Sequence, residues 1–219
     1  MNLLIIGAPG VGKGTMSRFL VAHYKLVHVS TGDMLRQAVA DKTSVGLKAQ
    51  SYMDKGELVP DEVIHDIIVE RLSQNDIKRG FLFDGYPRTV AQAIDLSEIL
   101  KQLDLKIDAI INLQVDDEIV IKRITGRRIC NECGSIFNIY YNAPKVEDVC
   151  DNCNAKLQIR KDDNLESLKI RLSEFHKSTS PVIDYYAKQN LVHNINADQD
   201  REDEFKDIQK VLEGLKWFL

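Results

Sequence analysis

The stretch Gly7-Ala8-Pro9-Gly10-Val11-Gly12-Lys13-Gly14-Thr15 directly follows the short apolar run Leu3–Ile6. An apolar run, a glycine-rich turn and then an amphipathic stretch from Met16 onward form the strand–loop–helix frame of a phosphate-binding loop. Glycines allow backbone N–H groups to converge on an anion without a Cβ in the way, and Lys13 adds a positive charge. An ordinary glycine turn is the alternative. The lysine, the threonine and the strand context together favour a loop that binds a nucleoside triphosphate.

The residue after the lysine departs from the usual pattern of such loops. That pattern has Ser or Thr next to the lysine, where the hydroxyl binds magnesium. Here Gly14 follows Lys13, and the hydroxyl comes one residue later, at Thr15. We therefore expect magnesium to be held mainly by the nucleotide phosphates and by water, because this ion gives up its hydration shell reluctantly.

The composition describes a chain that can bury one substantial core. Of its 219 residues, 44% are hydrophobic, the formal net charge is −4 and the isoelectric point is about 5.8. This acidic balance gives no general attraction to nucleic acid or to an anionic membrane, so an anion has to be bound by local positive charge. No apolar run is long enough for a membrane span or a signal peptide, and we expect a soluble, cytoplasmic protein.

Apolar runs and helical patterns alternate along the chain. The strand-like runs are Leu3–Ile6, Leu26–Val29, Phe81–Phe83, Ile107–Leu113 and Leu191–Ile195. Between them, Asp61–Leu72, Ala91–Leu103 and Asp116–Ile124 repeat apolar residues at three- and four-residue spacing, which is typical of helices. This alternation predicts a three-layer α/β fold, with a parallel sheet covered by helices on both faces and ligands at the carboxyl ends of the strands.

Two stretches interrupt the alternation. Residues 30–59 contain polar helix-like pieces with no strand between them, and residues 126–163 have little helical pattern and hold all four cysteines. We expect both to be insertions into the core, on the nucleotide side.

The cysteines form two pairs with the spacing of metal ligands. Cys130 and Cys133 enclose two residues, as do Cys150 and Cys153, and sixteen residues separate the pairs. This spacing predicts a four-cysteine zinc site, in which a closed set of thiolates leaves no position for water, so that the metal is structural. Two disulfides or reduced free thiols are the alternatives, and iron is the main competing metal. None of the five histidines is needed as a ligand.

Several arginines and one aspartate are placed where phosphates are expected. The arginines are Arg36, Arg88, Arg123, Arg127, Arg128, Arg160 and Arg171. Guanidinium groups bind phosphate oxygens through two parallel hydrogen bonds, so cations from separate segments can clamp a polyphosphate, although each of them singly fits a surface salt bridge better. Asp84 ends the run Phe81–Phe83, which is the arrangement that places a carboxylate beside the magnesium of a phosphate-binding loop. A capping or turn role for Asp84 is the alternative.

Five motifs together resemble the adenylate kinase family. They are Gly7–Thr15, Ser30–Arg36, Asp84–Thr89, Gly126–Arg128 and Arg160–Asp163, and they occur in the family's order along nearly the whole chain. The resemblance implies a core with a five-stranded parallel sheet (residues 1–29, 60–125 and 164–219). It also implies a small helical insertion that binds the acceptor (30–59) and a zinc-ribbon-like lid (126–163), as in the metal-bearing bacterial members. Tyr86 stands where the family pattern has phenylalanine, and we expect this ring mainly to pack near the acceptor.

The same resemblance implies the activity and the residues that carry it. The expected reaction is reversible transfer of the γ-phosphoryl group from ATP, with magnesium, to AMP, giving two ADP, and the family is monomeric. The ATP site is expected to comprise Gly10, Val11, Gly12, Lys13, Gly14, Thr15, Arg123 (stacked on the adenine), Arg127, Ile136, Phe137 and Gln199. The AMP site is expected to comprise Thr31, Arg36, Glu57, Leu58, Val59, Gly85, Tyr86, Pro87, Arg88, Gln92, Arg160 and Arg171. The expected catalytic set is Lys13, Asp84, Arg88, Arg127, Arg160 and Arg171, with Cys130, Cys133, Cys150 and Cys153 holding zinc.

Two other functions are alternatives at this point. Another nucleoside monophosphate (CMP, UMP or GMP) as acceptor keeps the chemistry, although Thr31 and Gln92 favour adenine by resemblance. A nucleotide-switched zinc-ribbon module that binds nucleic acid is the second. The acidic balance argues against it, and so does the presence of Lys145 as the one cation between the cysteine pairs.

Overall fold

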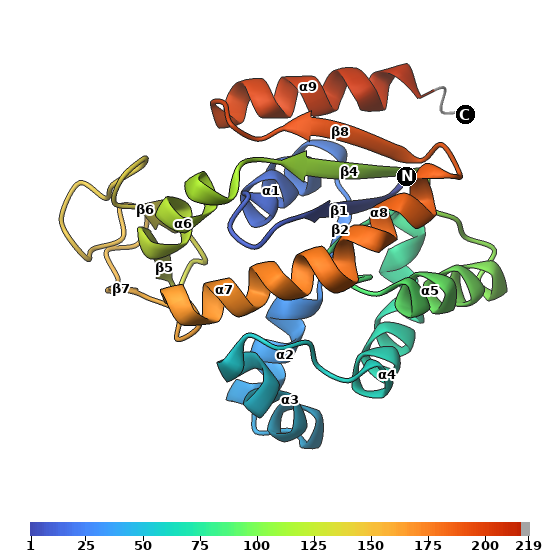
Figure 1. The fold of residues 1–219 in the computed structure, drawn as a ribbon, viewed down its shortest axis with the longest axis horizontal. Coiled ribbons are helices and arrows are strands. Elements are labelled where there is room, and N and C mark those ends of the chain that lie inside the picture. The colour runs from blue at the N-terminus through green and yellow to red at the C-terminus, as the bar shows by residue number, and fades with distance from the viewer. Residues whose placement is uncertain (216–219) are drawn as a thin grey trace.

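Five parallel strands form the centre of the molecule, and Figure 1 shows them side by side. The computed structural model describes residues 1–215, so residues 216–219 of the expected core segment 164–219 lie outside the described part. The strands are β1 (Asn2–Gly7), β2 (Val27–Ser30), β3 (Phe81–Asp84), β4 (Ala109–Gln114) and β8 (Val192–Asn196), in the order β2-β3-β1-β4-β8. They are the five predicted apolar runs, with small shifts at their ends. Every residue of β1 is buried, which explains an apolar run without alternation.

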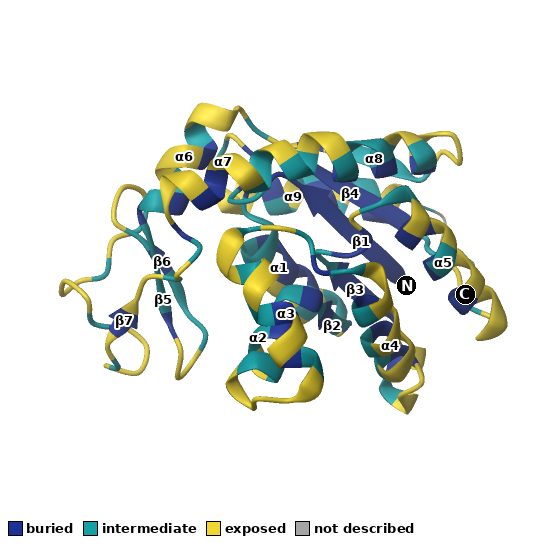
Figure 2. Cartoon of the chain, turned by 60° about the horizontal axis from the view of Figure 1, so that its bottom comes forward, coloured by how far each residue is buried: buried dark blue, intermediate teal, exposed yellow. Residues whose placement is uncertain are grey.

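Neighbouring residues along β1 face two different helical layers. Leu4 and Ile6 pack with residues of α4 (Asp61–Leu72), α5 (Val90–Gln102) and α8 (Ser180–Ala187). Leu3 and Ile5 pack with residues of α1 (Lys13–Tyr24) and α9 (Arg201–Gly214). Figure 2 shows the buried strands between helices whose outer faces are exposed. The predicted three-layer α/β fold is therefore confirmed.

The first irregular stretch consists of two helices, α2 (Thr31–Ala40) and α3 (Ser44–Lys55). Hydroxyl groups cap both helices, since Ser30 Oγ accepts a hydrogen bond from the N–H of Asp33 and Thr43 Oγ1 accepts one from the N–H of Gly46. A Cβ at Gly46 would lie 2.0 Å from the carbonyl oxygen of Ala38, so the two helices approach closely only because this residue is glycine. The polar helix-like pieces predicted for this stretch are present.

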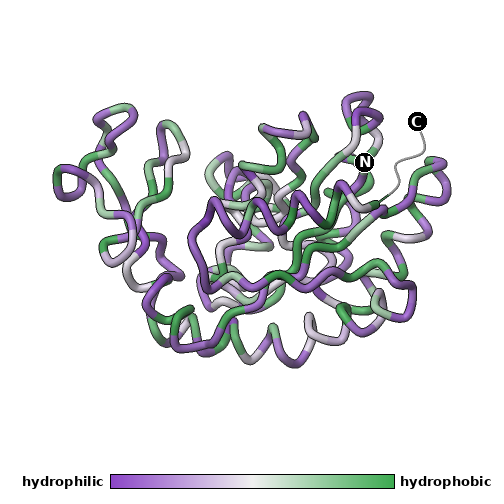
Figure 3. The backbone as a smooth tube through the Cα atoms, turned by 90° about the horizontal axis from the view of Figure 1, so that it is seen from above, coloured by the Kyte–Doolittle hydropathy of each residue, from purple (hydrophilic) through white to green (hydrophobic). Residues whose placement is uncertain are grey.

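The second irregular stretch holds a small antiparallel sheet. Its strands are β5 (Arg127–Cys130), β6 (Ile136–Asn138) and β7 (Leu157–Gln158), in the order β6-β5-β7, and α6 (Asp117–Thr125) leads into it. Figures 1 and 2 label these strands in a lobe that projects from the rest of the molecule, and the backbone tube of Figure 3 shows the same projection from above. The buried cluster of this lobe has four members, Cys130, Phe137, Cys150 and Leu157.

A long helical run returns from the lobe to the core. It consists of α7 (Leu165–Glu174), the π-helical turn η2 (Phe175–Thr179) and α8, which has proline in its first turn. Proline has no N–H for the hydrogen-bond ladder of a helix, and the π-helical turn lies directly before α8, which contains this proline. The short 3₁₀ helix η1 (Asn75–Arg79) precedes β3. In residues 1–215, none of the helices has the length and apolar character that crossing a membrane requires.

Candidate active site

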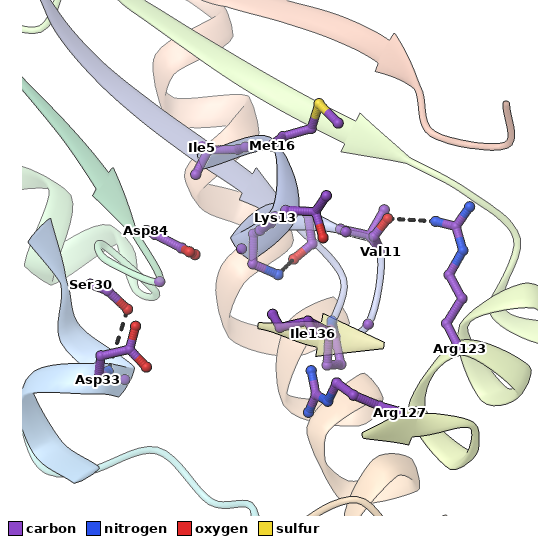
Figure 4. A pocket seen from close by; sticks show the side chains of 18 of the residues that line it. Ile5, Val11, Lys13, Met16, Ser30, Asp33, Asp84, Arg123, Arg127 and Ile136 are labelled. Carbon is purple, nitrogen blue, oxygen red and sulfur yellow. Dashed lines mark hydrogen bonds between the residues drawn. The ribbon is translucent and has the colours of Figure 1, made fainter. Parts of the chain in front are cut away.

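A glycine-rich loop joins the end of β1 to the start of α1 (Figure 4). Gly10 has a φ of +83° and Gly12 a φ of +122°, in the region that favours glycine. A Cβ at Gly10 would lie 2.6 Å from Cγ1 of Ile124 on α6, so a larger residue does not fit. No side chain caps α1, which begins at Lys13. The N–H of Thr15 donates to the carbonyl oxygen of Gly12 at 2.9 Å, whereas the N–H groups of Lys13 and Gly14 and the positive end of the helix dipole are available to an anion.

Lys13 folds its side chain back over this loop. Its Nζ donates hydrogen bonds to the carbonyl oxygens of Gly7, at 2.7 Å, and Ala8, at 2.9 Å. Burial lowers the pKa of Lys13 to about 8; the carboxylate of Asp84 opposes this effect, and the charge of Arg88 adds to it. The amine is therefore mostly protonated at neutral pH, and its positive charge lies in the cradle of the loop.

Asp84 lies at the carboxyl end of β3, next to the same loop (Figure 4). Burial alone would raise the pKa of Asp84, but His28, whose Nε2 is 3.7 Å from Asp84 Oδ2, and the charge of Lys13 bring it below its usual value. Ser17 Oγ donates to Oδ2 at 3.3 Å, and a Cβ at Gly14 would lie 4.0 Å from that oxygen. An ionised carboxylate that faces a phosphate-binding loop fits the oxygen ligands that magnesium prefers.

Among the arginines that line the same cleft as Lys13, four come from different parts of the chain and lie near the phosphate-binding loop or the smaller pocket: Arg88, Arg127, Arg160 and Arg171. Burial lowers the pKa of Arg88 to about 10 and that of Arg160 to about 10, and other arginines act in the same direction. Among the described residues, Nε of Arg160 is a buried donor without a hydrogen-bond partner. Buried cations that repel one another form a site that a bound polyanion would stabilise.

Two neighbouring aspartates orient two of these arginines. Arg127 Nε donates to Asp163 Oδ2 at 2.7 Å, and Arg127 Nη2 donates to the other oxygen of the same carboxylate. Arg171 Nη1 donates to Asp162 Oδ2 at 2.9 Å. Such charge-assisted bonds fix the planes of the guanidinium groups that face the cleft.

The cleft has a volume of about 1110 Å³ and extends from the glycine-rich loop to the lobe of β5 and β6. All residues expected at the ATP site line it, namely Gly10, Val11, Gly12, Lys13, Gly14, Thr15, Arg123, Arg127, Ile136, Phe137 and Gln199. Arg123 donates to the carbonyl oxygen of Val11 at 2.6 Å, as Figure 4 shows, and to that of Ala197 at 2.7 Å. These bonds lie in the plane of the guanidinium group, so they leave its faces for stacking.

A second pocket of about 350 Å³ adjoins the cleft on the side of α2 and α3. Its lining includes the residues expected at the AMP site, namely Thr31, Arg36, Glu57, Leu58, Val59, Gly85, Tyr86, Arg88, Gln92, Arg160 and Arg171. Pro87, also expected there, lines the larger cleft instead. Arg88, Arg160 and Arg171 line both spaces, so the two pockets meet at shared cations.

Tyr86 packs into the core next to this second pocket. It is 2% exposed, and its ring centroid lies 5.7 Å from that of Phe83. Its hydroxyl, which a phenylalanine would lack, donates to the carbonyl oxygen of Gln92 at 3.3 Å. The ring therefore packs as expected, and the hydroxyl adds a hydrogen bond to the backbone of α5.

The four cysteines come together in the small lobe. Their Sγ atoms all lie within 4.8 Å of one another, with Cys130–Cys153 at 3.4 Å and Cys133–Cys150 at 3.5 Å, and none forms a disulfide. A tetrahedral zinc site with Zn–S bonds of about 2.3 Å has sulfur atoms about 3.8 Å apart, so this set fits zinc.

The two cysteine turns also have the same backbone geometry. In the first turn, the N–H of Gly134 donates to the carbonyl oxygen of Cys130 at 2.9 Å. In the second, the N–H of Asn154 donates to that of Cys150 at 2.9 Å. Gly134 and Asn154 occupy the same left-handed position, with φ of +71° and +59°. Each turn therefore aims two sulfur atoms at one point.

Sequence reasoning assigned no role to several groups at this site. His28, Asp33 and Glu204 line the cleft, and Asp162 and Asp163 hold arginines. Only Asp162 and Asp163 leave a signal in the sequence, because they form an acidic pair directly after Arg160 and Lys161. A carboxylate near a buried arginine commonly forms charge-assisted hydrogen bonds with a guanidinium group. The other contacts join residues far apart in the chain and leave no local pattern.

Comparisons with known proteins agree with this geometry. A family model described as "Adenylate kinase" matches residues 5–191 of the chain. Proteins named "Adenylate kinase" from Bacillus thuringiensis (strain Al Hakam) and Bacillus cereus (strain 03BB102) are each 50% identical to it over 215 residues, which is 98% of this chain and 100% of theirs. One from Bacillus cytotoxicus is 49% identical over the same lengths.

Proposed function

The chain belongs to the adenylate kinase family and catalyses phosphoryl transfer between ATP and AMP, and on this premise we propose which parts of the molecule perform each step. ATP binds with its phosphates on the loop Gly10–Thr15 and its base beside Arg123, and AMP binds in the smaller pocket beside Gln92. The observation that carries this placement is that Arg88, Arg160 and Arg171 line both spaces. The γ-phosphate of ATP and the phosphate of AMP would therefore meet beside these arginines.

We also propose a division of the chain into three parts. Residues 1–29, 60–125 and 164–219 form the core, residues 30–59 bind the acceptor, and residues 126–163 are the lid. The helices α2 and α3 and the projecting sheet of β5, β6 and β7 support these boundaries. Closure of both insertions over the substrates would exclude water, which otherwise competes with AMP for the phosphoryl group.

The reacting groups require no proton transfer. An oxygen of the AMP phosphate attacks the γ-phosphorus, the bond from that phosphorus to the bridging oxygen breaks, and ADP leaves with the electron pair. The attacking oxygen already carries negative charge, because the second pKa of a phosphate monoester is about 6. Lys13 and the arginines of the cleft hold the two anions in line and neutralise the oxygens of the transferred group.

Two metals fit the residues present. Magnesium, bound with ATP, would neutralise phosphate charge, and the ionised carboxylate of Asp84 supports a position beside the loop. Zinc bound by Cys130, Cys133, Cys150 and Cys153 would hold the lobe together, because its apolar cluster is too small to do so alone. We also propose a monomer, since this chain itself supplies every residue expected at the two substrate sites, and a cytoplasmic location, since cysteines arranged for a metal fit a reducing compartment.

The acceptor assignment is tested by Arg88→Ala, with Arg79→Ala as the control. Arg79 is an exposed arginine in η1, before the amino end of β3. Arg88 lines the acceptor pocket, and its Nε donates to the carbonyl oxygen of Gly85 in the same pocket at 2.7 Å. We expect Arg88→Ala to raise the KM for AMP far more than the KM for ATP, and Arg79→Ala to change neither. Equal losses for the two substrates would contradict the assignment.

The identity of the acceptor is tested by a coupled assay that compares AMP, CMP, UMP and GMP with ATP and magnesium. We expect turnover with AMP to exceed turnover with the other three. Comparable rates with all four would show that the pocket does not select adenine.

A further inference from the structure

The amide of Gln92 is held at both of its ends. Gln92 lies in the first turn of α5, is 6% exposed and lines the smaller pocket. Its Oε1 accepts a hydrogen bond from the backbone N–H of Arg88 at 2.7 Å. Its Nε2 donates to Asp61 Oδ1 at 2.6 Å. Thr89 Oγ1 and the hydroxyl of Tyr86 bind the N–H and the carbonyl oxygen of the same residue, at 3.1 and 3.3 Å.

Each hydrogen-bond partner of the amide can play only one role, either donor or acceptor. A backbone N–H can only donate, and a carboxylate can only accept. If the amide turned by 180°, its oxygen would face the carboxylate of Asp61 and its NH₂ group would face the N–H of Arg88. Two contacts would then change from attractive to repulsive. The orientation is therefore set by two partners from separate segments, the first turn of α4 and the loop after β3.

An amide with a fixed orientation distinguishes purines that a rotating amide would accept equally. With two bonds made, the amide of Gln92 keeps one N–H and one acceptor lone pair. Adenine presents an amino donor at position 6 beside an acceptor at N1. A 6-oxopurine presents an acceptor and a donor at the same two places. An amide held in one orientation can form hydrogen bonds with only one of these two purine edges, because the other edge places donor against donor and acceptor against acceptor. An amide that can turn forms hydrogen bonds with either edge.

We propose that Asp61 is a specificity-determining residue, which selects a 6-aminopurine monophosphate over a 6-oxopurine monophosphate by fixing the amide orientation of Gln92. This inference rests on the proposed function, in which Gln92 meets the base of the acceptor. Asp61 itself is a positioning residue, since it acts through Gln92 and its side chain is exposed at the start of α4.

The experiment compares AMP with IMP, which differs from AMP only by the oxo group at position 6 and the proton at N1. The variant is Asp61→Asn, because asparagine has the shape of aspartate but can offer either an oxygen or an NH₂ group. Residue 61 then no longer opposes the turned amide of Gln92, and only the N–H of Arg88 still favours the observed orientation. At saturating ATP, we expect the ratio of kcat/KM for IMP to that for AMP to rise by at least about fivefold. The change should lie mainly in the KM values of the two monophosphates, with the KM for ATP unchanged. Asp61→Ser, whose hydroxyl also donates and accepts, is a second variant with the same expectation.

The control is Glu62→Gln, an exposed neighbour in the same helical turn that loses the same charge. It should leave the IMP/AMP ratio unchanged. A purely structural role for Asp61 would lower activity with both monophosphates and leave the ratio as it is, and that result would overturn the proposal.

Gln92→Ala separates this inference from the function on which it rests. If Gln92→Ala raises the KM for AMP while Asp61→Asn leaves the ratio unchanged, the inference on Asp61 is wrong and the acceptor site stands. If Gln92→Ala leaves the KM for AMP unchanged, both the acceptor assignment and the inference are overturned.

Discussion

The carboxylate of Asp163 binds the guanidinium of Arg127 through two hydrogen bonds, one of them 2.7 Å long, and thereby joins the two ends of the projecting lobe. Arg127 is the first residue of β5, and Asp163 lies just before α7. The side chain of Asp163 has no exposed surface, and that of Arg127 is 15% exposed. A paired group in this environment is costly to leave without its partner.

The first prediction concerns this pair. Asp163→Asn should lower the free energy of unfolding by about 3–5 kcal/mol, because it leaves Arg127 buried without its counter-charge. It should also reduce kcat/KM at least tenfold by releasing Arg127 from its place in the cleft. Urea unfolding and steady-state kinetics measure the two effects. The control is Asp148→Asn, since Asp148 is 55% exposed and its nearest contact with Arg128 is 3.6 Å. Equal effects of the two substitutions would contradict the structural role of the buried pair.

The second prediction concerns Lys13. Lys13→Met should leave a folded protein with kcat/KM reduced by roughly 10²–10³-fold, because it removes the positive charge from the loop. The control is Lys210→Met, since the side chain of Lys210 is 74% exposed on α9. Circular dichroism and a coupled assay measure fold and turnover. Near-normal turnover of Lys13→Met would remove Lys13 from the mechanism.

The third prediction is a pH dependence of nucleotide binding. The pKa of Lys13, lowered mainly by burial, is about 8, and a bound polyphosphate favours the charged amine. Binding of ATP at pH 8 should therefore take up protons, and the affinity should fall as the pH rises above 8. Calorimetry in buffers with different ionisation enthalpies measures this uptake. Lys13→Met should show less uptake; the same uptake in both proteins would place the proton on another group.

The fourth prediction concerns the cysteines. Native protein should contain one zinc ion per chain, and Cys130→Ser should lose it, because serine does not replace a thiolate ligand. The lobe should then unfold at a lower temperature while the core sheet keeps its transition. Elemental analysis and calorimetry measure these effects, and Asn131→Ser in the same turn should retain the metal. Native protein without a bound metal ion would rule out the zinc site, and bound iron would appear in the same measurement.

The fifth prediction concerns Glu204, a buried carboxyl group on α9 whose Oε1, among the described residues, has no hydrogen-bond partner. Burial raises its pKa from 4.5 to about 7. The folded protein thus binds more protons than the unfolded chain between these values, and Glu204 lowers the stability as the pH rises through this range. Glu204→Gln should therefore increase the free energy of unfolding at pH 8 by on the order of 1–3 kcal/mol, and by much less at pH 5.

Urea unfolding at the two pH values measures this difference. Glu202→Gln, at an exposed position of the same helix, is the control and should change little at either pH. A gain in stability that is the same at pH 5 and pH 8 would exclude the titration of Glu204 as its cause.

The sheet and the metal cluster could be predicted from the sequence because their signals are local. A strand buried on both faces, such as β1, needs a continuous apolar run, and two cysteine pairs with fixed internal spacing form one cluster wherever the chain between them goes. The residue pattern did not predict the strands of the lobe, and the family resemblance implied only a zinc-ribbon-like lid there. β7 has two residues and β6 three, too few to establish an alternating pattern.

The partners of the site residues could not be predicted, because they depend on tertiary contacts. Asp61 reaches Gln92 across a separation of 31 residues, and Arg123 reaches Ala197 across 74. Nothing in the local sequence of either residue indicates the other. The sequence therefore identified many of the groups at the site, and the structure adds which groups hold them in place.

The contact between Gly10 and Ile124 has a consequence for how the chain can change. The phosphate-binding loop rests directly on α6, at a distance that leaves no room for a single methyl group, and Arg123 ties the next residue of the loop to the same helix. An inserted residue in the loop would therefore displace the helix from which the lobe begins. Length variation is better tolerated around Val146, between the cysteine pairs, where the side chain is 61% exposed and an added residue would extend into solvent.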